Sequence, residues 1–184
     1  MDNETGRQLF HMAVGFIAIA LLYLFGRWFM IAAVFFIMMI GMALINQRKL
    51  GKEIPVIRWF EDRFEREDAP LPGWGSACYA AGVLIALTFL SSPGEIMAVI
   101  FILAVGDGVS TLAGRRIGRH GMPYNRNKTV EGTAAFFASS LLSYIFIGPA
   151  ALPLALAGAI AESVPMVDDN ILVPIACTAV LMIL

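Results

Sequence analysis

One stretch of the sequence, residues 106–133, concentrates polar side chains between two apolar runs. Asp107 lies at the end of the first run, where an ionisable side chain is costly and usually functional. Gly106 and Gly108 flank it, so that the backbone can approach a ligand closely there. Glycines and arginines then follow one another: Gly114, Arg115, Arg116, Gly118 and Arg119. On a helix this set gives a small-residue face beside a cationic face, against which a phosphate chain could lie.

The second half of this segment predicts an anion site at the start of a helix. Four polar residues precede a new apolar run: Asn125, Asn127, Lys128 and Thr129. Thr129 and Thr133 are candidate N-cap or first-turn residues of that helix, and Glu131 would complement its positive end. The N–H groups of a helix N-terminus bind anions, and Lys128 would add a point charge for a phosphate. The sequence is not a Walker A motif, so only the chemistry of phosphate binding is inferred.

The basic residues of the segment also fit a simpler interpretation, in which they only set the orientation of the chain in a membrane. That interpretation leaves Asp107, the glycines and the paired asparagines unexplained. Three residues fit a plain surface role equally well: Arg119, His120 and Arg126.

Two further polar clusters lie far from this segment. Asp168, Asp169 and Asn170 form an oxygen-rich group that suits Mg²⁺, and with Asp107 they would hold a metal–triphosphate. The alternative is a polar turn in which Asn170 caps the last helix. Glu162 lies within an apolar run and is expected to face the interior of a bundle.

Near the N-terminus, Glu4, Arg7 and His11 recur at helical spacing and therefore share one helix face. Arg7 would hold a phosphate, and His11 would orient a hydroxyl group. A packed histidine at the membrane interface explains His11 equally well.

The composition places these residues in a membrane protein. Of the 184 residues, 59% are hydrophobic and 15% are charged, whereas a soluble domain carries about 25% charged residues. The net charge of −1 gives no general attraction to nucleic acid. Cys78 and Cys177 lie in apolar runs without metal-site spacing and are predicted to be free core thiols.

Seven apolar stretches predict an all-α bundle of about seven transmembrane spans, forming a single integral membrane domain over residues 1–184. The expected spans are 9–25, 28–45, 75–90, 96–112, 133–147, 150–164 and 171–184. Every Lys and Arg except Arg27 lies before span one, in the connection 47–73 or in the segment 106–133. Positive charge marks cytoplasmic loops, so a cytoplasmic N-terminus and an active site facing the cytoplasm are predicted. This topology also brings the clusters at both ends of the chain to the same membrane face as Asp107.

The stretch 49–68 mixes both charge signs with apolar and aromatic residues. An amphipathic helix at the membrane interface and a solvated linker with anchoring aromatics are both consistent with this pattern.

The motifs resemble the polyprenol kinase family, which includes dolichol kinases, phytol kinases and CTP-dependent diacylglycerol kinases. The run from Pro123 to Lys128 is especially similar to phytol kinases, and the run from Lys128 to Thr133 is similar to dolichol kinases. Glu4, Arg7 and His11 resemble the opening element of the family, although Gln8 stands where a lysine is usual. Glu162 and the 168–170 cluster fit its closing element, so the resemblance covers the chain end to end.

The resemblance implies a CTP-dependent lipid kinase that phosphorylates a membrane isoprenoid alcohol of the dolichol, polyprenol or phytol type. Such transfer depends on positioning and charge neutralisation. The residues expected to bind Mg²⁺, one of them accepting the alcohol proton, are Asp107, Asp168 and Asp169. Those expected to bind the nucleotide are Gly114, Arg115, Arg116, Gly118, Asn125, Asn127, Lys128, Thr129 and Gly132. Those expected to position lipid or phosphate are Arg7, His11, Glu131, Glu162 and Asn170.

Several alternatives stay open. A CTP-dependent diacylglycerol kinase would use another lipid, and a CDP-lipid synthase-like cytidylyltransferase would release pyrophosphate. An ion- or proton-coupled transporter would use Asp107, Glu162 and Asp168 as a pathway, although the sequence lacks paired inverted halves. A lipid-binding subunit without activity is a further possibility. No residue visibly reads a nucleotide base, and homo-oligomerisation is left open.

Overall fold

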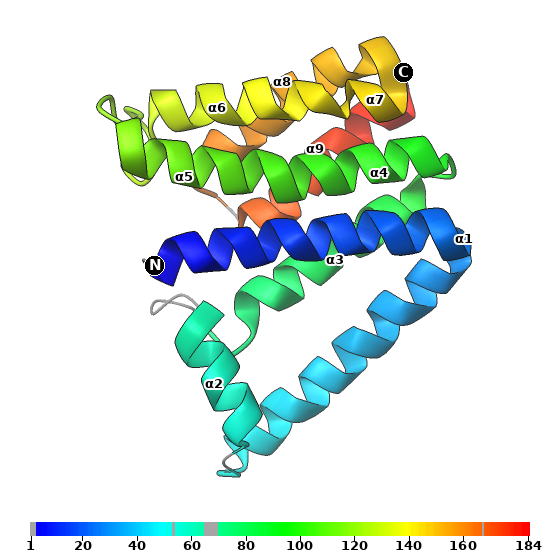
Figure 1. Ribbon diagram of the computed structural model, residues 1–184, viewed down its shortest axis with the longest axis vertical. Helices are drawn as coiled ribbons and strands as arrows, with labels where there is room; N and C mark the ends of the chain where they lie inside the picture. Colours follow the sequence, from blue (N-terminus) through cyan, green and yellow to red (C-terminus); the bar gives the residue numbers. More distant parts are fainter. Residues whose placement is uncertain (1–2, 53, 65–69, 167) are drawn as a thin grey trace.

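The computed structural model of the protein describes residues 3–52, 54–64, 70–166 and 168–184, which form helices joined by short connections (Figure 1). The elements in chain order are α1 (Asn3–Lys49), α2 (Pro55–Phe64), α3 (Trp74–Phe89), α4 (Pro93–Phe101), the π-helix η1 (Ile102–Gly106), α5 (Asp107–Ile117), α6 (Val130–Ser140), η2 (Leu141–Ser143), α7 (Tyr144–Ile147), η3 (Gly148–Ala150), α8 (Ala151–Ser163) and α9 (Asp169–Ile183). The described residues contain no β-strand beyond one isolated bridge, so the predicted all-α class is confirmed.

Among the described residues, three helical runs are long and apolar enough to cross a membrane: Glu4–Lys49, Pro93–Ile117 and Val130–Ser163. Helices α3 and α9 are shorter apolar helices. The first run turns at Gly26, and the third reverses at Gly148, where φ is 59°, so that α8 packs back on α6. The predicted spans fall within these segments, and a membrane helix bundle is confirmed. The number of crossings and the cytoplasmic N-terminus stay predictions.

The turn in α1 is built on glycine and is fixed by the residue that follows it. Gly26 has φ 79°, a conformation that glycine adopts without steric cost. The Arg27 guanidinium then donates to the carbonyl oxygens of Leu87, at 2.6 Å, and Thr88, at 2.9 Å, at the end of α3. These are carbonyls that a helix C-terminus leaves without an intrahelical partner. The one basic residue outside the predicted cytoplasmic regions therefore caps a helix.

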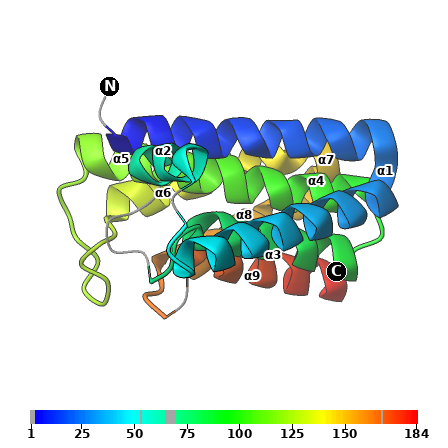
Figure 2. The ribbon, with the colours of Figure 1, turned by 90° about the horizontal axis from the view of Figure 1, so that it is seen from below.

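The central layer of the bundle is the helix formed by α4 and η1. Its residues Ile96, Ile100 and Ile102 are fully buried. The first half of α1 and the α6–α7 run lie on either side of it, with α3, α8 and α9 behind (Figures 1 and 2). The second half of α1 leaves the bundle, and with α2 and α3 it frames an open triangle (Figure 1). Its exposed apolar side chains, which include Phe35, Phe36 and Met42, suit contact with lipid.

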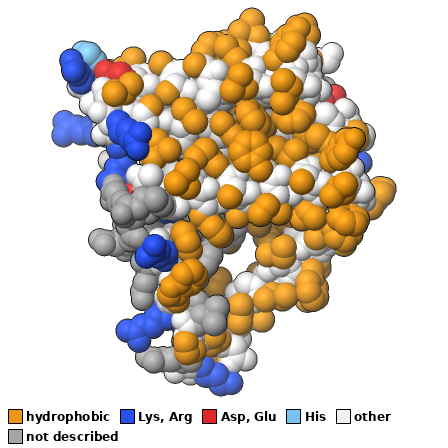
Figure 3. Space-filling view, in the orientation of Figure 1, with side chains coloured by type: hydrophobic (Ala, Val, Ile, Leu, Met, Phe, Trp, Pro, Cys, Tyr) orange, Lys and Arg blue, Asp and Glu red, His pale blue; other side chains and the backbone are white. Residues whose placement is uncertain are grey.

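The surface separates charge from apolar side chains. Hydrophobic side chains cover the middle of the face seen in Figure 3, and lysines and arginines gather at one end. We call this end the polar end; it carries the start of α1, the α5–α6 loop and the α8–α9 turn (Figures 1 and 2). The predicted convergence of the polar clusters on one end is therefore confirmed, although which side of a membrane this end faces stays a prediction. Arg66, one of the basic residues used to predict orientation, lies outside the described residues.

Candidate active site

The polar segment 106–133 comprises the last residue of η1, helix α5, a loop and the start of α6. Its first part, α5, continues the α4–η1 helix, and its last part begins α6. Glycines bring these two helices close together. A Cβ on Gly114 would stand 3.0 Å from Thr129 Oγ1, and one on Gly132 would stand 3.0 Å from the carbonyl oxygen of Ser110. Helix packing therefore explains these glycines, and their contact with a nucleotide stays a prediction.

The loop between α5 and α6 folds back on itself and places Lys128 just before α6. The backbone N–H of Met122 donates to the Lys128 carbonyl at 2.9 Å, and the Lys128 N–H donates to the Asn125 carbonyl at 3.0 Å. Thr129 is the N-cap of α6, since its hydroxyl oxygen accepts from the Gly132 N–H at 3.1 Å. The predicted cap is confirmed.

The same loop is tied to the end of α8. The buried side chain of Asn125 donates to the carbonyl oxygen of Ser163 at 3.0 Å, and the Tyr124 hydroxyl donates to Ser163 Oγ at 2.9 Å. Asn125 therefore holds the loop in place. Asn127, whose side chain is exposed, is the asparagine better placed to meet a ligand.

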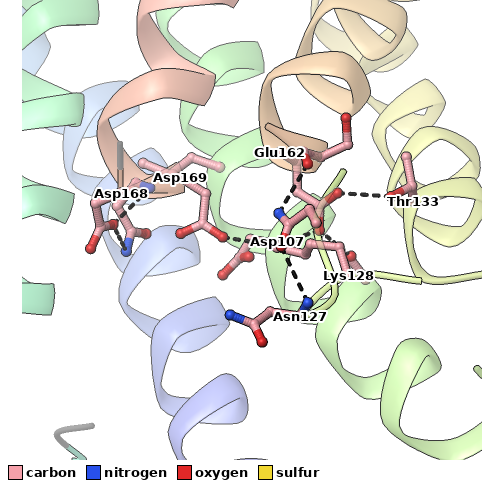
Figure 4. Close-up of polar contacts among 12 residues, drawn as sticks. Asp107, Asn127, Lys128, Thr133, Glu162, Asp168 and Asp169 are labelled. Carbon is pink, nitrogen blue, oxygen red and sulfur yellow. Dashed lines mark hydrogen bonds and ion pairs between the residues drawn. The ribbon is translucent and has the colours of Figure 1, made fainter. Parts of the chain in front are cut away.

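Lys128 is the centre of the site (Figure 4). Its Nζ atom lies 2.6 Å from Glu162 Oε1 and 2.7 Å from Asp169 Oδ2. Glu162 is fully buried and also accepts hydrogen bonds from the hydroxyls of Ser110, at 2.7 Å, and Thr133, at 3.0 Å. Buried charges persist in proteins when they are paired and hydrogen-bonded in this way. Glu162 is thus a fixed anchor for the lysine.

Electrostatics keep Lys128 charged. Burial alone disfavours its ammonium group, but the carboxylates of Asp169, Asp107 and Glu162 outweigh burial and raise the pKa of Lys128 above its ordinary value. One ammonium therefore faces three carboxylates. A cluster in which carboxylates outnumber the ammonium is of a kind that also binds metal cations.

Asp107 is placed by the π-helix that precedes it. A π-helix bonds each N–H five residues back, and such turns occur frequently at functional sites. The Nε2 atom of His11 lies 3.3 Å from the carbonyl oxygen of Leu103, within η1, and 3.9 Å from Asp107 Oδ2. Asp107 is 4% exposed. His11 of α1 therefore lies close to Asp107. This agrees with the prediction that the start of the first span and Asp107 lie at the same membrane face.

Glu4 joins the start of α1 to the end of α5. Its carboxylate accepts from Arg7 at 2.5 Å and from Gln8 at 2.9 Å, and Arg115 lies 3.9 Å away. Arg7, predicted to hold a phosphate, is paired with Glu4 in this structure. Arg115 and Arg116 are exposed at the end of α5.

Glu131 has a different partner from the predicted lipid or phosphate. Its carboxylate lies 2.6 Å from His120 Nδ1, and its second oxygen accepts from the His120 N–H at 3.3 Å. The pair closes the base of the α5–α6 loop. His120 therefore has a structural contact that its surface position did not predict.

The three aspartates predicted to bind a metal do not form one set. Asp168 Oδ1 accepts from the backbone N–H of Asn170 at 3.1 Å and from its side-chain amide at 3.0 Å. Asp168, and not Asn170, therefore caps α9, and Figure 4 shows it on the far side of Asp169 from Lys128. Within the described ranges, no group of three His, Cys, Asp or Glu side chains is placed to hold a metal. The carboxylates that do share one neighbour, Lys128, are Asp107, Glu162 and Asp169.

The sequence did not predict that the hydroxyl groups of Ser110 and Thr133 donate hydrogen bonds to Glu162. Ser110 was not singled out, and Thr133 was predicted only as a cap. Ser110 follows Asp107 by three residues, which puts both on one helix face. This three-residue spacing is the sequence feature from which a role for Ser110 beside Asp107 could have been predicted. The two free thiols predicted from sequence, Cys78 and Cys177, are confirmed and buried.

The fold and the site define a membrane helix bundle with a buried lysine–carboxylate cluster at one end. No protein-family model and no solved structure matches the chain. Over 94% of its length the chain is 32% identical to an uncharacterized protein of Methanocaldococcus jannaschii, of which it covers 89%. Over 95% of its length it is 28% identical to a Glycine max protein named probable phytol kinase 3, chloroplastic. Over 92% it is 29% identical to the chloroplastic farnesol kinase of Arabidopsis thaliana.

The chain belongs to the polyprenol and phytol kinase family, as its motifs predict. It spans 61% of the length of the Glycine max protein and 62% of the length of the Arabidopsis thaliana kinase.

Proposed function

We propose that the protein is a membrane-embedded kinase that transfers the terminal phosphate of CTP to the hydroxyl of a prenyl alcohol. The observation that carries this proposal is the placement of Lys128. Its charge is held by Glu162 and Asp169, beside Asp107, directly before the N-terminus of α6. Similarity to proteins named phytol kinase and farnesol kinase supports a prenyl alcohol as the acceptor.

The donor nucleotide would meet the polar end from the aqueous side. The ammonium of Lys128, which lies directly before α6, would bind phosphate oxygens. Arg115 and Arg116, exposed at the end of α5, would neutralise further charge on the triphosphate. Such an arrangement supplies the positioning and charge neutralisation that phosphoryl transfer requires.

The bonds and the proton of the proposed transfer step can be followed one by one. The alcohol oxygen attacks the terminal phosphorus, a new O–P bond forms, and the bond between that phosphorus and the bridging oxygen breaks. CDP leaves with the electron pair of the broken bond. The proton of the alcohol passes to the carboxylate of Asp107, and Lys128 stabilises the charge on the phosphate oxygens.

The residues present fit a Mg²⁺ ion that shares its coordination with the nucleotide. Mg²⁺ is usually held by one or two carboxylates together with substrate phosphates. Asp107 and Asp169 would hold it, and the excess of carboxylates around Lys128 favours this. Asp168 is left out of this set because its Oδ1 atom caps α9 and no contact with Lys128 is recorded for it. When bound, the ion would neutralise negative charge on the transferred phosphate.

The proposal is tested with purified protein in lipid nanodiscs. Each terminally labelled nucleoside triphosphate is combined with farnesol, geranylgeraniol, phytol, dolichol or diacylglycerol, and the products are separated by chromatography. We expect a labelled prenyl phosphate with CTP, and none from a Lys128→Met variant. Release of pyrophosphate with a CDP-lipid would indicate a cytidylyltransferase instead, and the absence of lipid product with every pair would overturn the proposal.

A further inference from the structure

The hydroxyl of Tyr79, in α3, is a buried polar group that the mechanism above does not use. Tyr79 is 8% exposed, and its hydroxyl has no hydrogen-bond partner among the described residues. Buried polar groups in native structures nearly always have a partner, and an exception needs an explanation. A bound ligand is one such explanation, and the neighbours of this hydroxyl indicate which kind.

Tyr79 lies against the residues that reach Asp107. Its ring packs edge-on against the ring of His11, with centroids 4.5 Å apart, and His11 lies 3.9 Å from Asp107. Three elements, α1, α3 and the start of α5, therefore bring a phenol, an imidazole and a carboxylate together. The sequence did not predict this, because Tyr79 lies within an apolar stretch far from the polar clusters.

The Tyr79 hydroxyl lies deeper in the bundle than the other two groups. It is 3.0 Å from the point where a Cβ on Gly15 would stand, and Gly15 is one turn of α1 beyond His11. The same point adjoins Ala104, which precedes Asp107 by three residues on the buried side. The hydroxyl therefore stands where the polar end gives way to apolar packing. A ligand with one polar atom at the end of an apolar chain matches such a boundary.

We propose that Tyr79, His11 and Asp107 form the subsite for the acceptor alcohol. The alcohol oxygen accepts a hydrogen bond from the Tyr79 hydroxyl and donates its own to the Asp107 carboxylate, and His11 packs against Tyr79 with its Nε2 atom 3.9 Å from that carboxylate. This assignment rests on the proposed function, since it places the acceptor hydroxyl beside the terminal phosphate of a nucleotide bound at Lys128.

The first test removes only the phenolic oxygen. In a Tyr79→Phe variant we expect the KM for the prenyl alcohol to rise about tenfold, the effect of one lost hydrogen bond, while the KM for the nucleotide is unchanged. Tyr23→Phe is the matched control, because Tyr23 is 78% exposed on the apolar surface, and it should behave as wild type. An unchanged KM for the alcohol, or an equal rise for both substrates, would overturn the assignment.

A second test does not depend on catalysis. We expect geranylgeraniol without nucleotide to raise the thermal unfolding midpoint of the wild type more than its methyl ether, which cannot donate a hydrogen bond. The difference reports donation to Asp107, whereas loss of the phenolic oxygen in Tyr79→Phe should lower the rise given by both ligands. An equal rise for alcohol and ether in the wild type, or unchanged rises in Tyr79→Phe, would overturn the subsite. If the wild type showed this binding but no phosphoryl transfer, the subsite would stand and the proposed function would fail.

If Tyr79→Phe does not fold, photo-cross-linking of the wild-type protein tests the proposed subsite instead. A farnesol analogue with a diazirine beside its hydroxyl is photolysed with the wild-type protein, and the labelled peptides are mapped. Labels at residues 11–15 or 79–83 support the subsite, and labels confined to other segments overturn it.

Discussion

Lys128 and Arg27 are cations at opposite ends of the bundle, and they differ in what surrounds them. Arg27 donates to the carbonyl oxygens of Leu87 and Thr88, which are neutral groups at the end of α3. Lys128 lies against Glu162 and Asp169, with the charge of Asp107 nearby. The first arrangement satisfies a helix end and leaves nothing to bind. The second places three carboxylates beside one ammonium, and the proposed nucleotide and metal site is built on this cluster.

The comparison also separates structural from chemical uses of a charged side chain. Backbone carbonyls are present at every helix C-terminus, so Arg27 needs no special neighbours. Glu162 requires Ser110, Thr133 and Lys128 at once, from three different elements. We therefore expect substitution at the two ends to separate stability from activity.

The largest effect is expected from Lys128→Met. Loss of the ammonium should lower kcat/KM for the nucleotide by about 10³-fold, because the phosphate charge loses its buried donor. The variant should also be destabilised by about 3–5 kcal/mol, since Glu162 is left buried without its ion-pair partner. Steady-state kinetics and denaturant unfolding in detergent measure the two effects.

The control is the double variant Lys128→Met with Glu162→Gln. It should regain much of the lost stability, because Glu162 is no longer a buried carboxylate without its lysine, and it should remain inactive. Activity in the double variant would show that Lys128 acts only on folding.

A smaller effect is expected from Asp169→Asn, with Asp168→Ala as its neighbour for comparison. Asp169→Asn should lower kcat about 10²-fold, since its carboxylate faces Lys128 and the proposed metal. Asp168→Ala should remove a helix cap worth about 1 kcal/mol and change kcat less than about threefold. Equal losses of kcat in the two variants would restore the three-aspartate metal site predicted from the sequence.

Arg27→Met tests the opposite end of the bundle. It should lower the free energy of unfolding by about 1.5–3 kcal/mol, the worth of hydrogen bonds from a charged group, and leave both KM values unchanged. Thermal unfolding measures the loss of stability, and steady-state kinetics on the same preparation measures the two KM values. A kinetic defect in a folded Arg27→Met protein would contradict the division between the two ends.

The smallest effect is expected from Thr129→Ala. Loss of the cap on α6 should cost about 1 kcal/mol, with less than about a threefold change in the KM for the nucleotide. A rise in that KM of tenfold or more would instead give Thr129 the nucleotide contact that the sequence predicts.

The sequence predicted those parts of the molecule that depend on local pattern. The apolar stretches located the helices, and Thr129 was identified as a cap from its place before an apolar run. Spacing along one helix also grouped Glu4, Arg7 and His11 correctly. Each of these properties is decided within a few turns of one helix.

Contacts between helices could not be predicted in the same way. Lys128 meets Glu162 across 34 positions of sequence, and Ser110 meets it across 52. Residue spacing shows which side chains share one face of a helix, but it does not show which other helix packs against that face. The contact between Lys128 and Glu162 could therefore not be predicted from the sequence. Asp168 and Asp169 show the complementary error, since adjacent residues at a helix start point in different directions and take different roles.

The π-helical segment η1 has a consequence for the comparison of related chains. Five residues, Ile102–Gly106, occupy a turn that a plain α-helix makes with one fewer. A relative with a regular helix here would align with a one-residue gap before the aspartate. Closing that gap rotates Asp107 by about 100°, away from both His11 and Lys128. A one-residue gap at this point of an alignment would therefore identify homologues that lack the π-helical turn. Such homologues would share the fold but place the acidic side chain of the site differently.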